Sequence, residues 1–320
     1  MRGEHYDLVG KRVYVAGHGG MVGSAIARRL STEGCAILVA SRRELDLIDQ
    51  AAVDQWFRIN QPHAVFLAAA RVGGIHANNV HRADFLYDNL MIAANVIRAA
   101  HATGVEKLMF LGSSCIYPKH APQPMREDVL LTGPLEPTNE PYAIAKIAGL
   151  KLAESYRRQH GRDFISVMPT NIYGPGDNYH PENSHVAAAL IRRFHDAKVN
   201  GRPEEIVWGT GTPKREFLYV DDLADACVHI MRVYSADEHV NVGTGEEIAI
   251  GDFARLVARV VGYQGRLTFD TTKPDGTPLK RLDVSRLTGL GWRYKVALET
   301  GIAQAYASYL ASLTTGPRER

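Results

Sequence analysis

The sequence is poor in cysteine, in net charge and in long apolar runs, and each shortage excludes a class of protein. Its three cysteines, Cys35, Cys115 and Cys227, are widely spaced and form no CxxC pair, so they indicate neither a disulfide framework nor a structural zinc site. The formal net charge is only +2, which gives no electrostatic reason to expect nucleic acid or an anionic membrane as a partner. Apolar runs such as Ala64–Ala70 are far shorter than a membrane span, and the N-terminal stretch MRGEHYDLVGKR has no apolar segment of signal-peptide length. We therefore expect a cytoplasmic protein with no resident metal.

What the sequence does contain is an alternation of short apolar runs and helical stretches over its first two-thirds. The runs expected as buried strands are Val13–Ala16, Ala36–Ala40, Ala64–Ala70, Lys107–Gly112 and Phe164–Met168. The helical patterns between them are Gly23–Glu33, Ala51–Asn60, Ala83–Thr103 and Tyr142–His160. Strands that are apolar throughout and alternate with helices predict an α/β fold with a Rossmann-type, doubly wound parallel sheet.

The composition changes after Pro169. Residues Asn171–Ser184 are dense in Gly, Pro, Asn and Asp, which predicts a long functional loop. Further helices are expected at His185–Asp196, Asp221–Tyr234, Gly251–Val261 and Leu298–Leu313. We expect a Rossmann domain made of residues 1–170 and 217–244, and a smaller C-terminal substrate-binding lobe made of residues 171–216 and 245–320.

A glycine motif lies between the first expected strand and the first helix. Gly17, Gly20 and Gly23 form GxxGxxG, with Val22 where a GxGxxG motif would have its last glycine. Glycine is required where the backbone turns sharply, approaches a pyrophosphate or packs a helix on a strand. Such a motif can also be a plain turn, but a strand-to-helix junction near the N-terminus favours dinucleotide binding.

The end of the second expected strand bears on the choice of coenzyme. NAD-binding folds usually have an acid there for the ribose 2′-hydroxyl, whereas this chain has Ser41, Arg42 and Arg43. A hydroxyl and guanidinium groups suit a 2′-phosphate, so NADP is favoured. The alternative is that both arginines simply face solvent.

Tyr142 and Lys146 open an expected helix and lie four residues apart, which places them on one face. A lysine ammonium beside a phenol is expected to lower the pKa of the phenol, so that Tyr142 can act as an acid near neutral pH. The pattern YxxxK also occurs by chance on amphipathic helices. Ser113, at the end of a strand where Rossmann sheets place their chemistry, supports the catalytic interpretation because its hydroxyl can polarise a carbonyl.

Together these motifs resemble the extended short-chain dehydrogenase/reductase family and, within it, the GDP-L-fucose synthase family. The resemblance covers about residues 13 to 280 and rests on the segments AGHGGMVGSAI, LAAARVGGIHANN, FLGSSCIYPK, EPTNEPYAIAK, VMPTNIYGPGDNYHPENSHV, REFLYVDD and KPDGTP. It implies that the chain takes GDP-4-keto-6-deoxy-D-mannose, inverts C3 and C5, and reduces the C4 ketone with NADPH.

The resemblance also implies roles for particular residues. Cys115 and His185 match the family's acid–base pair for the two inversions, although a free cysteine is more often a small buried hydrophobe. The implied coenzyme contacts, beyond the residues already named, are Met21, Val22, Leu111, Gly112, Ser114, Lys146, Pro169, Thr170, Asn171, Ile172 and His185. The implied contacts of the GDP-sugar are Arg193, Trp208, Arg215, Asp275 and Lys280. By residue type alone, Arg193 could belong to a solvated helix face and Trp208 to the core of the lobe.

Two residues depart from the family pattern. Gly19 stands where similar sequences have a basic residue beside the 2′-phosphate, and Arg71 replaces a lysine. The first departure leaves Arg42 as the main argument for NADP.

Alternatives and oligomeric state complete the expectations. Two kinds of function compete with this one. The first is a related nucleotide-sugar epimerase or 4,6-dehydratase, and the second is a dinucleotide-sensing protein without activity. A dehydratase would need adjacent acids where this chain has Cys115 and Ile116, and a sensor would not need an acid–base set. The long helical stretches Ala83–Thr103 and Tyr142–His160 are apolar on more than one face, and related enzymes pair them across a two-fold axis, so a homodimer is expected.

Overall fold

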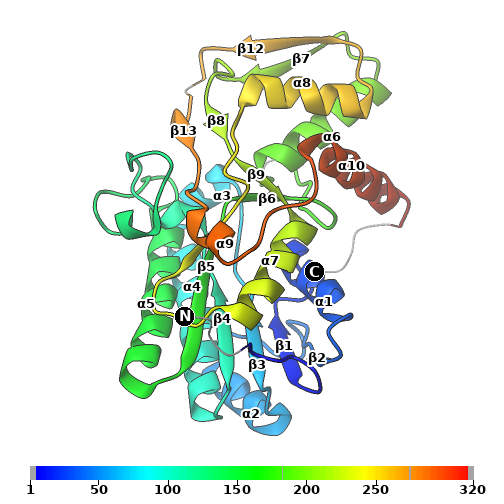
Figure 1. The fold of residues 1–320 in the computed structure, drawn as a ribbon. Coiled ribbons are helices and arrows are strands. Elements are labelled where there is room, and N and C mark those ends of the chain that lie inside the picture. The colour runs from blue at the N-terminus through cyan, green and yellow to red at the C-terminus, as the bar shows by residue number, and fades with distance from the viewer. Residues whose placement is uncertain (1–4, 182, 274, 316–320) are drawn as a thin grey trace.

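The computed structural model describes residues 5–181, 183–273 and 275–315. The lower body in Figure 1 is built around a six-stranded sheet in which all neighbouring strands are parallel. The strands are β1 (Arg12–Ala16), β2 (Ala36–Leu38), β3 (Ala64–Leu67), β4 (Lys107–Leu111), β5 (Asp163–Pro169) and β10 (Val240–Val242). Their order is β10-β5-β4-β3-β1-β2, so the chain reverses direction across the sheet between β1 and β3. The predicted Rossmann-type fold is confirmed, and ligands bind such sheets at this reversal, beyond the carboxyl ends of the strands.

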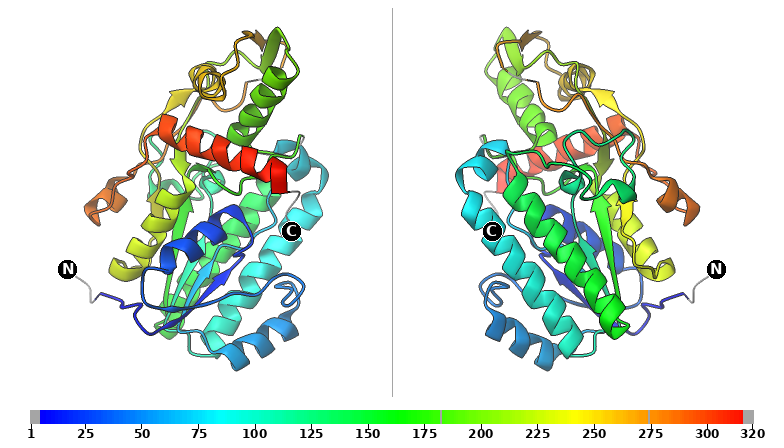
Figure 2. Two further views of the ribbon diagram at one scale, coloured as in Figure 1. Left: turned by 90° about the vertical axis from the view of Figure 1, so that its right-hand side faces the viewer. Right: turned by 90° about the vertical axis from the view of Figure 1, so that its left-hand side faces the viewer.

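Helices cover both faces of the sheet because its strands bury side chains on both sides. Val13 and Val15 of β1 pack in one apolar cluster with α1 (Met21–Leu30) and α7 (Val220–Val233). Tyr14, between them, packs in a second cluster on the opposite face. The helices of that face are α2 (Gln50–Asn60), α4 (Arg82–Ala102) and α5 (Glu140–His160). Figure 2 shows α4 and α5 side by side.

The helices expected from the sequence begin and end within a few residues of the observed ones, but the strands after β5 were not predicted, among them the following two. Val240–Val242 forms the sheet edge β10, with Val240 in register with Val167 of β5. Asn171–Tyr173, expected as loop, forms β6, which pairs with β9 (Phe217–Tyr219). Each of these two strands has only three residues, too few for a local pattern, and each is stabilised by a partner distant in sequence.

The upper part of Figure 1 is a lobe with its own apolar cluster. Its helices are α6 (Val186–Val199), α8 (Ile250–Val261) and α10 (Leu298–Thr315). Its strands are β7 (Glu204–Trp208), β8 (Lys214–Arg215), β11 (Ile248–Ala249), β12 (Arg266–Asp270) and β13 (Leu279–Lys280). β7 pairs with β12, and β8 lies between β11 and β13.

Two short helices, α3 (Ile75–Val80) and α9 (Ser285–Gly289), and single 3-10 turns at Ser114–Ile116 and Glu127–Val129 complete the described chain. The expected domain ranges begin and end in residues 1–4 and 316–320, which lie outside the described residues. Within the described ranges, no helix is both long and apolar enough to cross a bilayer.

Candidate active site

The glycine loop joins β1 to α1 at the reversal of the sheet. Gly17 has φ +87°, and a Cβ on it would lie 2.7 Å from the Cα of Ala69. A Cβ on Gly23 would lie 2.1 Å from the carbonyl oxygen of Gly17. The amide of Gly20 donates a hydrogen bond to that same oxygen at 3.0 Å. Gly20 immediately precedes α1, which has no acid in its first turn. Met21 and Val22 form that first turn. The loop therefore presents a compact backbone and an uncompensated helix N-terminus, a favourable place for an anion.

Ser41 and Arg42 follow β2 and are exposed. The side chain of Arg42 is 76% exposed, with its nearest carboxylate, Asp46, 3.9 Å away. A Cβ on Gly19 would meet nothing within 4 Å, so the space beside the loop is open. Sequence reasoning missed Glu44, whose carboxylate accepts a 2.7 Å hydrogen bond from the amide of Ser41. Its only signal was an acid two residues after Arg42.

Tyr142 and Lys146 lie one turn apart near the start of α5, facing the end of β4. The ammonium of Lys146 lies 5.7 Å from the centre of the Tyr142 ring and donates a 2.8 Å hydrogen bond to the carbonyl of Leu111. Lys146 is only 4% exposed. Burial lowers its pKa to about 8.

The expectation that Lys146 lowers the pKa of Tyr142 was wrong for the free protein. Burial raises the pKa of Tyr142, and the nearby Cys115 adds to the rise. The physical reason is that the ammonium of Lys146 is directed to the Leu111 carbonyl and not to the phenol oxygen. Tyr142 is thus a proton donor, held in its neutral form.

Ser113 and Cys115 lie on the turn that leaves β4. The amide of Cys115 donates to the hydroxyl of Ser113 at 3.4 Å, and the thiol is buried. Burial raises the pKa of Cys115, opposed by the ammonium of Lys280, a hydrogen bond from Ser113 and the charge of Lys146. The thiol is therefore protonated at neutral pH.

His185 immediately precedes α6 and accepts the amide of Ala189 at 2.9 Å with its carbonyl. Its ring remains accessible to solvent, but the protein atoms around it lower its pKa by desolvation, and the ammonium of Lys280 acts in the same direction. Lys280, on β13, is thus close enough to influence both His185 and Cys115. Around Lys280 the structure therefore has a protonated thiol, which can donate a proton, and a neutral imidazole, which can accept one.

The predicted coenzyme segments lie at the ends of β4 and β5. Leu111 is the last residue of β4, and Gly112 and Ser114 follow it; Pro169 is the last residue of β5, and Thr170, Asn171 and Ile172 follow it. A Cβ on Gly112 would lie 2.3 Å from the sulfur of Met168, so a larger residue would require the end of the Met168 side chain to move. The amide of Thr170 donates to the carbonyl of Val242 at 3.0 Å. The chain therefore leaves β4 toward α5, and leaves β5 toward β6, at the same edge of the sheet.

Among the predicted substrate residues, Arg193 and Trp208 belong to neighbouring elements of the lobe. The guanidinium of Arg193 pairs with the buried Glu205 at 2.5 Å and also donates to the carbonyl of Ile206, two residues before Trp208. Trp208 is 68% exposed, with the ammonium of Lys273 5.6 Å from its ring. Trp208 is therefore not part of the core of the lobe, and Arg193 is more than a solvated residue of a helix face.

Arg215, Asp275 and Lys280 gather around β8 and β13. Arg215 donates to the carbonyls of Thr277 at 2.6 Å and of Lys214 at 2.7 Å. Burial lowers its pKa, while the charge of Asp275 opposes that effect. Asp275 accepts from the amide of Thr210 at 2.9 Å. These contacts hold a half-buried guanidinium near Lys280, suited to an anionic group.

The comparisons with known proteins identify the family. A profile of the NAD dependent epimerase/dehydratase family matches residues 13–243. The chain belongs to this family. Its curated relatives include GDP-L-fucose synthase 1 of Arabidopsis thaliana, 59% identical over 94% of each chain. The GDP-L-fucose synthase of Escherichia coli strain K12 is 57% identical over 94% of this chain and 97% of that protein.

Solved structures of similar proteins have the same fold. A GDP-L-fucose synthetase from Naegleria fowleri, solved bound to NADP, superposes with a TM-score of 0.90, at 28% identity and over 98% of both chains. MlghC, a GDP-mannoheptose C4 reductase from Campylobacter jejuni with NADP bound, gives a TM-score of 0.87 at 37% identity, over 94% of this chain and 98% of that one.

One buried residue of this family member was missed by sequence reasoning. Glu216 follows Arg215, is 0% exposed, and accepts the amides of Gly245 and Leu282, both at 2.8 Å. Its carbonyl accepts the side-chain amide of Asn171 at 2.8 Å. Glu216 thus links Asn171, through its carbonyl, to Gly245 and to the segment just after β13, through its carboxylate. Its only sequence signal was an acid inside the apolar run of REFLYVDD.

Proposed function

We propose that this chain is a GDP-L-fucose synthase, which epimerises C3 and C5 of GDP-4-keto-6-deoxy-D-mannose and reduces the C4 ketone with NADPH. The observation that carries the proposal is the thiol–imidazole pair of Cys115 and His185 beside Tyr142 and Lys146, in a chain 59% identical to a curated enzyme of that name. The pair supplies the proton transfers that inversion requires, and Tyr142 supplies the proton that reduction requires.

The coenzyme of this reaction is NADP(H), and its pyrophosphate would bind at the glycine loop and the N-terminus of α1. Gly17 and Gly23 admit no Cβ, and a Cβ on Gly19 would meet nothing within 4 Å. Ser41 and Arg42 would hold the 2′-phosphate, and Lys146 would hold the nicotinamide ribose. The rest of the coenzyme would contact the segments 111–114 and 169–172 and His185. When bound, the coenzyme supplies the hydride.

Epimerisation follows from the acidity of the carbon–hydrogen bonds next to the ketone. A base removes the proton from one face at C3 or C5, and an acid returns one on the other face. The resting protonation states make Cys115 the donor and His185 the acceptor, and each transfer prepares the pair for exchanged roles. Ser113 and Tyr142 hydrogen-bond the C4 oxygen and stabilise the enolate.

Reduction uses the same oxygen site. Tyr142, kept neutral by burial, donates its proton to the C4 oxygen as the carbon is reduced. The adjacent Lys146 ammonium stabilises the phenolate that remains. The GDP group is held by Arg193, Trp208 and Arg215, with Asp275 and Lys280 beside it; arginine forks match a diphosphate and the exposed indole offers a surface for stacking.

The coenzyme and the substrate are assigned to different parts of the chain. We propose that residues 1–170 and 217–244 form the NADP-binding domain and that residues 171–216 and 245–320 bind the GDP-sugar. A free catalytic thiol at Cys115 requires a reducing compartment, which supports a cytoplasmic location.

A homodimer through α4 and α5 is part of the proposal. Tyr87 and Leu90 of α4 and Ile144 of α5 are 57%, 38% and 44% exposed, and covering them in a second copy would bury an apolar surface. Light scattering at micromolar concentration should give twice the chain mass, and Tyr87→Glu with Ile144→Glu should give the monomer. A monomeric wild type would contradict the dimer.

The assay for the function is the consumption of NADPH with GDP-4-keto-6-deoxy-D-mannose, with the product identified by NMR. GDP-L-fucose is the expected product. Turnover of another keto-sugar nucleotide alone would assign the chain to a different nucleotide-sugar enzyme. Coenzyme binding without turnover of any such substrate would indicate a sensor.

A further inference from the structure

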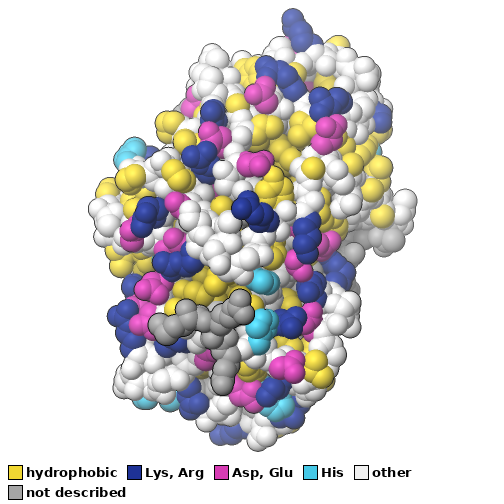
Figure 3. Space-filling model, in the orientation of Figure 1, with side chains coloured by type: hydrophobic (Ala, Val, Ile, Leu, Met, Phe, Trp, Pro, Cys, Tyr) yellow, Lys and Arg dark blue, Asp and Glu magenta, His cyan; other side chains and the backbone are white. Residues whose placement is uncertain are grey.

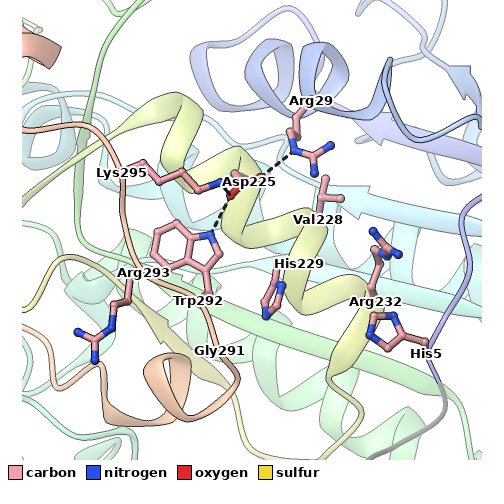
Figure 4. A pocket seen from close by; sticks show the side chains of 10 residues that line it. All are labelled: His5, Arg29, Asp225, Val228, His229, Arg232, Gly291, Trp292, Arg293 and Lys295. Atoms are coloured by element: carbon pink, nitrogen blue, oxygen red, sulfur yellow. Dashed lines mark hydrogen bonds and ion pairs between the residues drawn. The ribbon is translucent and has the colours of Figure 1, made fainter.

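A basic pocket opens on the face of the molecule that carries α1 and α7. Its volume is about 410 Å³, and its walls come from the C-terminal halves of α1 and α7 and from the segment 291–295 after α9 (Figure 4). The glycine loop lies at the other end of α1, so the pocket contains none of the residues assigned to coenzyme or substrate. On the surface in Figure 3, which shows the face seen in Figure 1, dark blue and cyan basic side chains gather near the centre.

Asp225, the acid in the wall of the pocket, is already neutralised. It accepts hydrogen bonds from Arg29 at 2.8 Å, Lys295 at 2.8 Å and the indole of Trp292 at 3.0 Å. Burial opposes ionisation, but the hydrogen bonds from Arg29, Lys295 and Trp292 hold the pKa of Asp225 at about 2. Asp225 is therefore a fixed, fully paired anion and does not repel a ligand as a free carboxylate would.

The cations of the pocket are in excess. Arg29, Arg232, Arg293 and Lys295 all line it, and the carboxylates that pair with them are Asp225 and Glu33. Glu33 is shared, since it pairs with Arg29 at 2.5 Å and with Arg232 at 3.4 Å. Among the described residues, four cationic side chains are therefore matched by only two carboxylates, and Arg293 pairs with neither of them.

Hydrogen-bond donors remain as well. Within the described part of the chain, the Nη2 of Arg29 and the Nε and Nη2 of Arg232 donate to no acceptor. His229 also lines the pocket, but its Nε2 already donates to the carbonyl of Leu290 at 2.8 Å, so a neutral imidazole has no further N–H to donate. Figure 4 shows Arg29 and Arg232 on the same side of the pocket, with Val228 between them and His229 next to it.

We propose that this pocket binds the phosphate dianion of a small phosphorylated molecule, or phosphate itself, between Arg29 and Arg232. Guanidinium groups present paired donors that match the oxygens of a phosphate. A dianion would balance the excess of two cationic side chains in the pocket as a whole, and the pocket is large enough for more than the anion alone. The proposal does not depend on the proposed catalytic function.

The test is equilibrium dialysis of the full chain, saturated with NADPH and with GDP so that both active-site regions are occupied, against radiolabelled inorganic phosphate. We expect one saturable site per chain, with a dissociation constant on the order of 1 mM, weakened at least tenfold by Arg232→Ala. The matched control is Arg259→Ala, because Arg259 also ends a helix and pairs with one glutamate, Glu299, at 3.2 Å.

Each outcome decides the proposal. Loss of binding in Arg232→Ala but not in Arg259→Ala, with NADPH turnover unchanged in both, supports it. Non-saturable binding, or equal effects of the two variants, overturns it. Competition by GMP identifies the source: displacement at much lower concentration than by phosphate indicates a nucleotide, and equal displacement indicates free phosphate. A salt-sensitive affinity is expected because the cations are partly exposed.

Discussion

The end of the sheet and the lobe above it hold their functional residues in different ways. Tyr142, Lys146 and Cys115 lie on α5 and on the turn after β4, and buried contacts such as the hydrogen bond from Lys146 to Leu111 fix them. Trp208 and Arg215 lie on short strands of the lobe, and Trp208 is mostly exposed. Burial shifts pKa values and thus provides acid–base chemistry, whereas exposure leaves a surface free to accept a ligand. Substitutions at the end of the sheet should therefore change mainly the reaction rate, and substitutions in the lobe should change mainly the affinity for the substrate.

The largest effect is expected from Tyr142→Phe. This substitution removes the proton donor for the ketone and should lower the rate of reduction by about 10²–10⁴-fold. Deuterium from solvent should still enter at C3 or C5, because Cys115 and His185 remain. NMR of the recovered sugar nucleotide measures both the extent of reduction and the entry of deuterium. Reduction at the wild-type rate would remove Tyr142 from the mechanism.

Cys115→Ser should have the complementary effect. Serine keeps the size of the side chain, but its hydroxyl is too weak an acid to exchange protons with carbon, so epimerisation should slow by about 10²–10⁴-fold. The variant should still bind NADPH and should slowly reduce the unepimerised ketone. If Cys115→Ser makes GDP-L-fucose normally, Cys115 is a buried hydrophobe and nothing more.

Lys146→Met tests the stability consequence of burial. Burial lowers the pKa of Lys146 from 10.5 to about 8, so the unfolded chain binds this proton more tightly than the folded chain does. At pH 7 the buried charge costs about 3 kcal/mol of stability, and the cost disappears as the pH rises from 8 to 10.5. The substitution also removes the hydrogen bond to Leu111, which offsets about 1 kcal/mol of the stability gained by removing the charge.

Lys146→Met should thus raise the free energy of unfolding in urea at pH 7 by roughly 1–2 kcal/mol, the balance of these two terms. The gain should shrink as the pH rises above 8, while catalysis is lost at every pH. Lys151→Met, which removes an exposed ammonium from the same helix, is the control. A gain that does not depend on pH would show that the charge of Lys146 is not penalised.

Trp208→Ala tests the lobe. Loss of a stacking surface worth about 0.5–1.5 kcal/mol should raise KM for the GDP-sugar by roughly 2–10-fold and leave kcat and the melting temperature nearly unchanged. Ile206→Ala is the matched control, since Ile206 lies on the same face of β7 and is also exposed. Equal effects of the two variants would mean that Trp208 does not contact the substrate.

The smallest effect is expected at Arg42. Because its side chain is mostly exposed, Arg42→Ala should reduce the preference for NADPH over NADH by only about two- to fivefold, the effect of one screened charge. Gly19→Arg should enlarge the preference, because a side chain there meets open space. Comparison of kcat/KM for the two coenzymes decides, and a wild type that prefers NADH would refute the role of Arg42.

The sequence by itself determined the parallel sheet, the glycine loop and the spacing of Tyr142 and Lys146. These features depend on local periodicity and on conformations that only glycine adopts, such as the positive φ of Gly17. It also supplied the family pattern from which Cys115 and His185 were predicted.

Only the tertiary structure decided which residues are buried together. The strands β6 and β10 exist because distant partners pair with them, and Glu216 is fully enclosed because segments around residues 245 and 282 close over it. The pKa of Tyr142 rises because the phenol is desolvated by burial in the folded protein, and the Lys146 ammonium donates to the carbonyl of Leu111. Burial and hydrogen-bond direction depend on contacts between segments far apart in the chain, and no local pattern in the sequence encodes them.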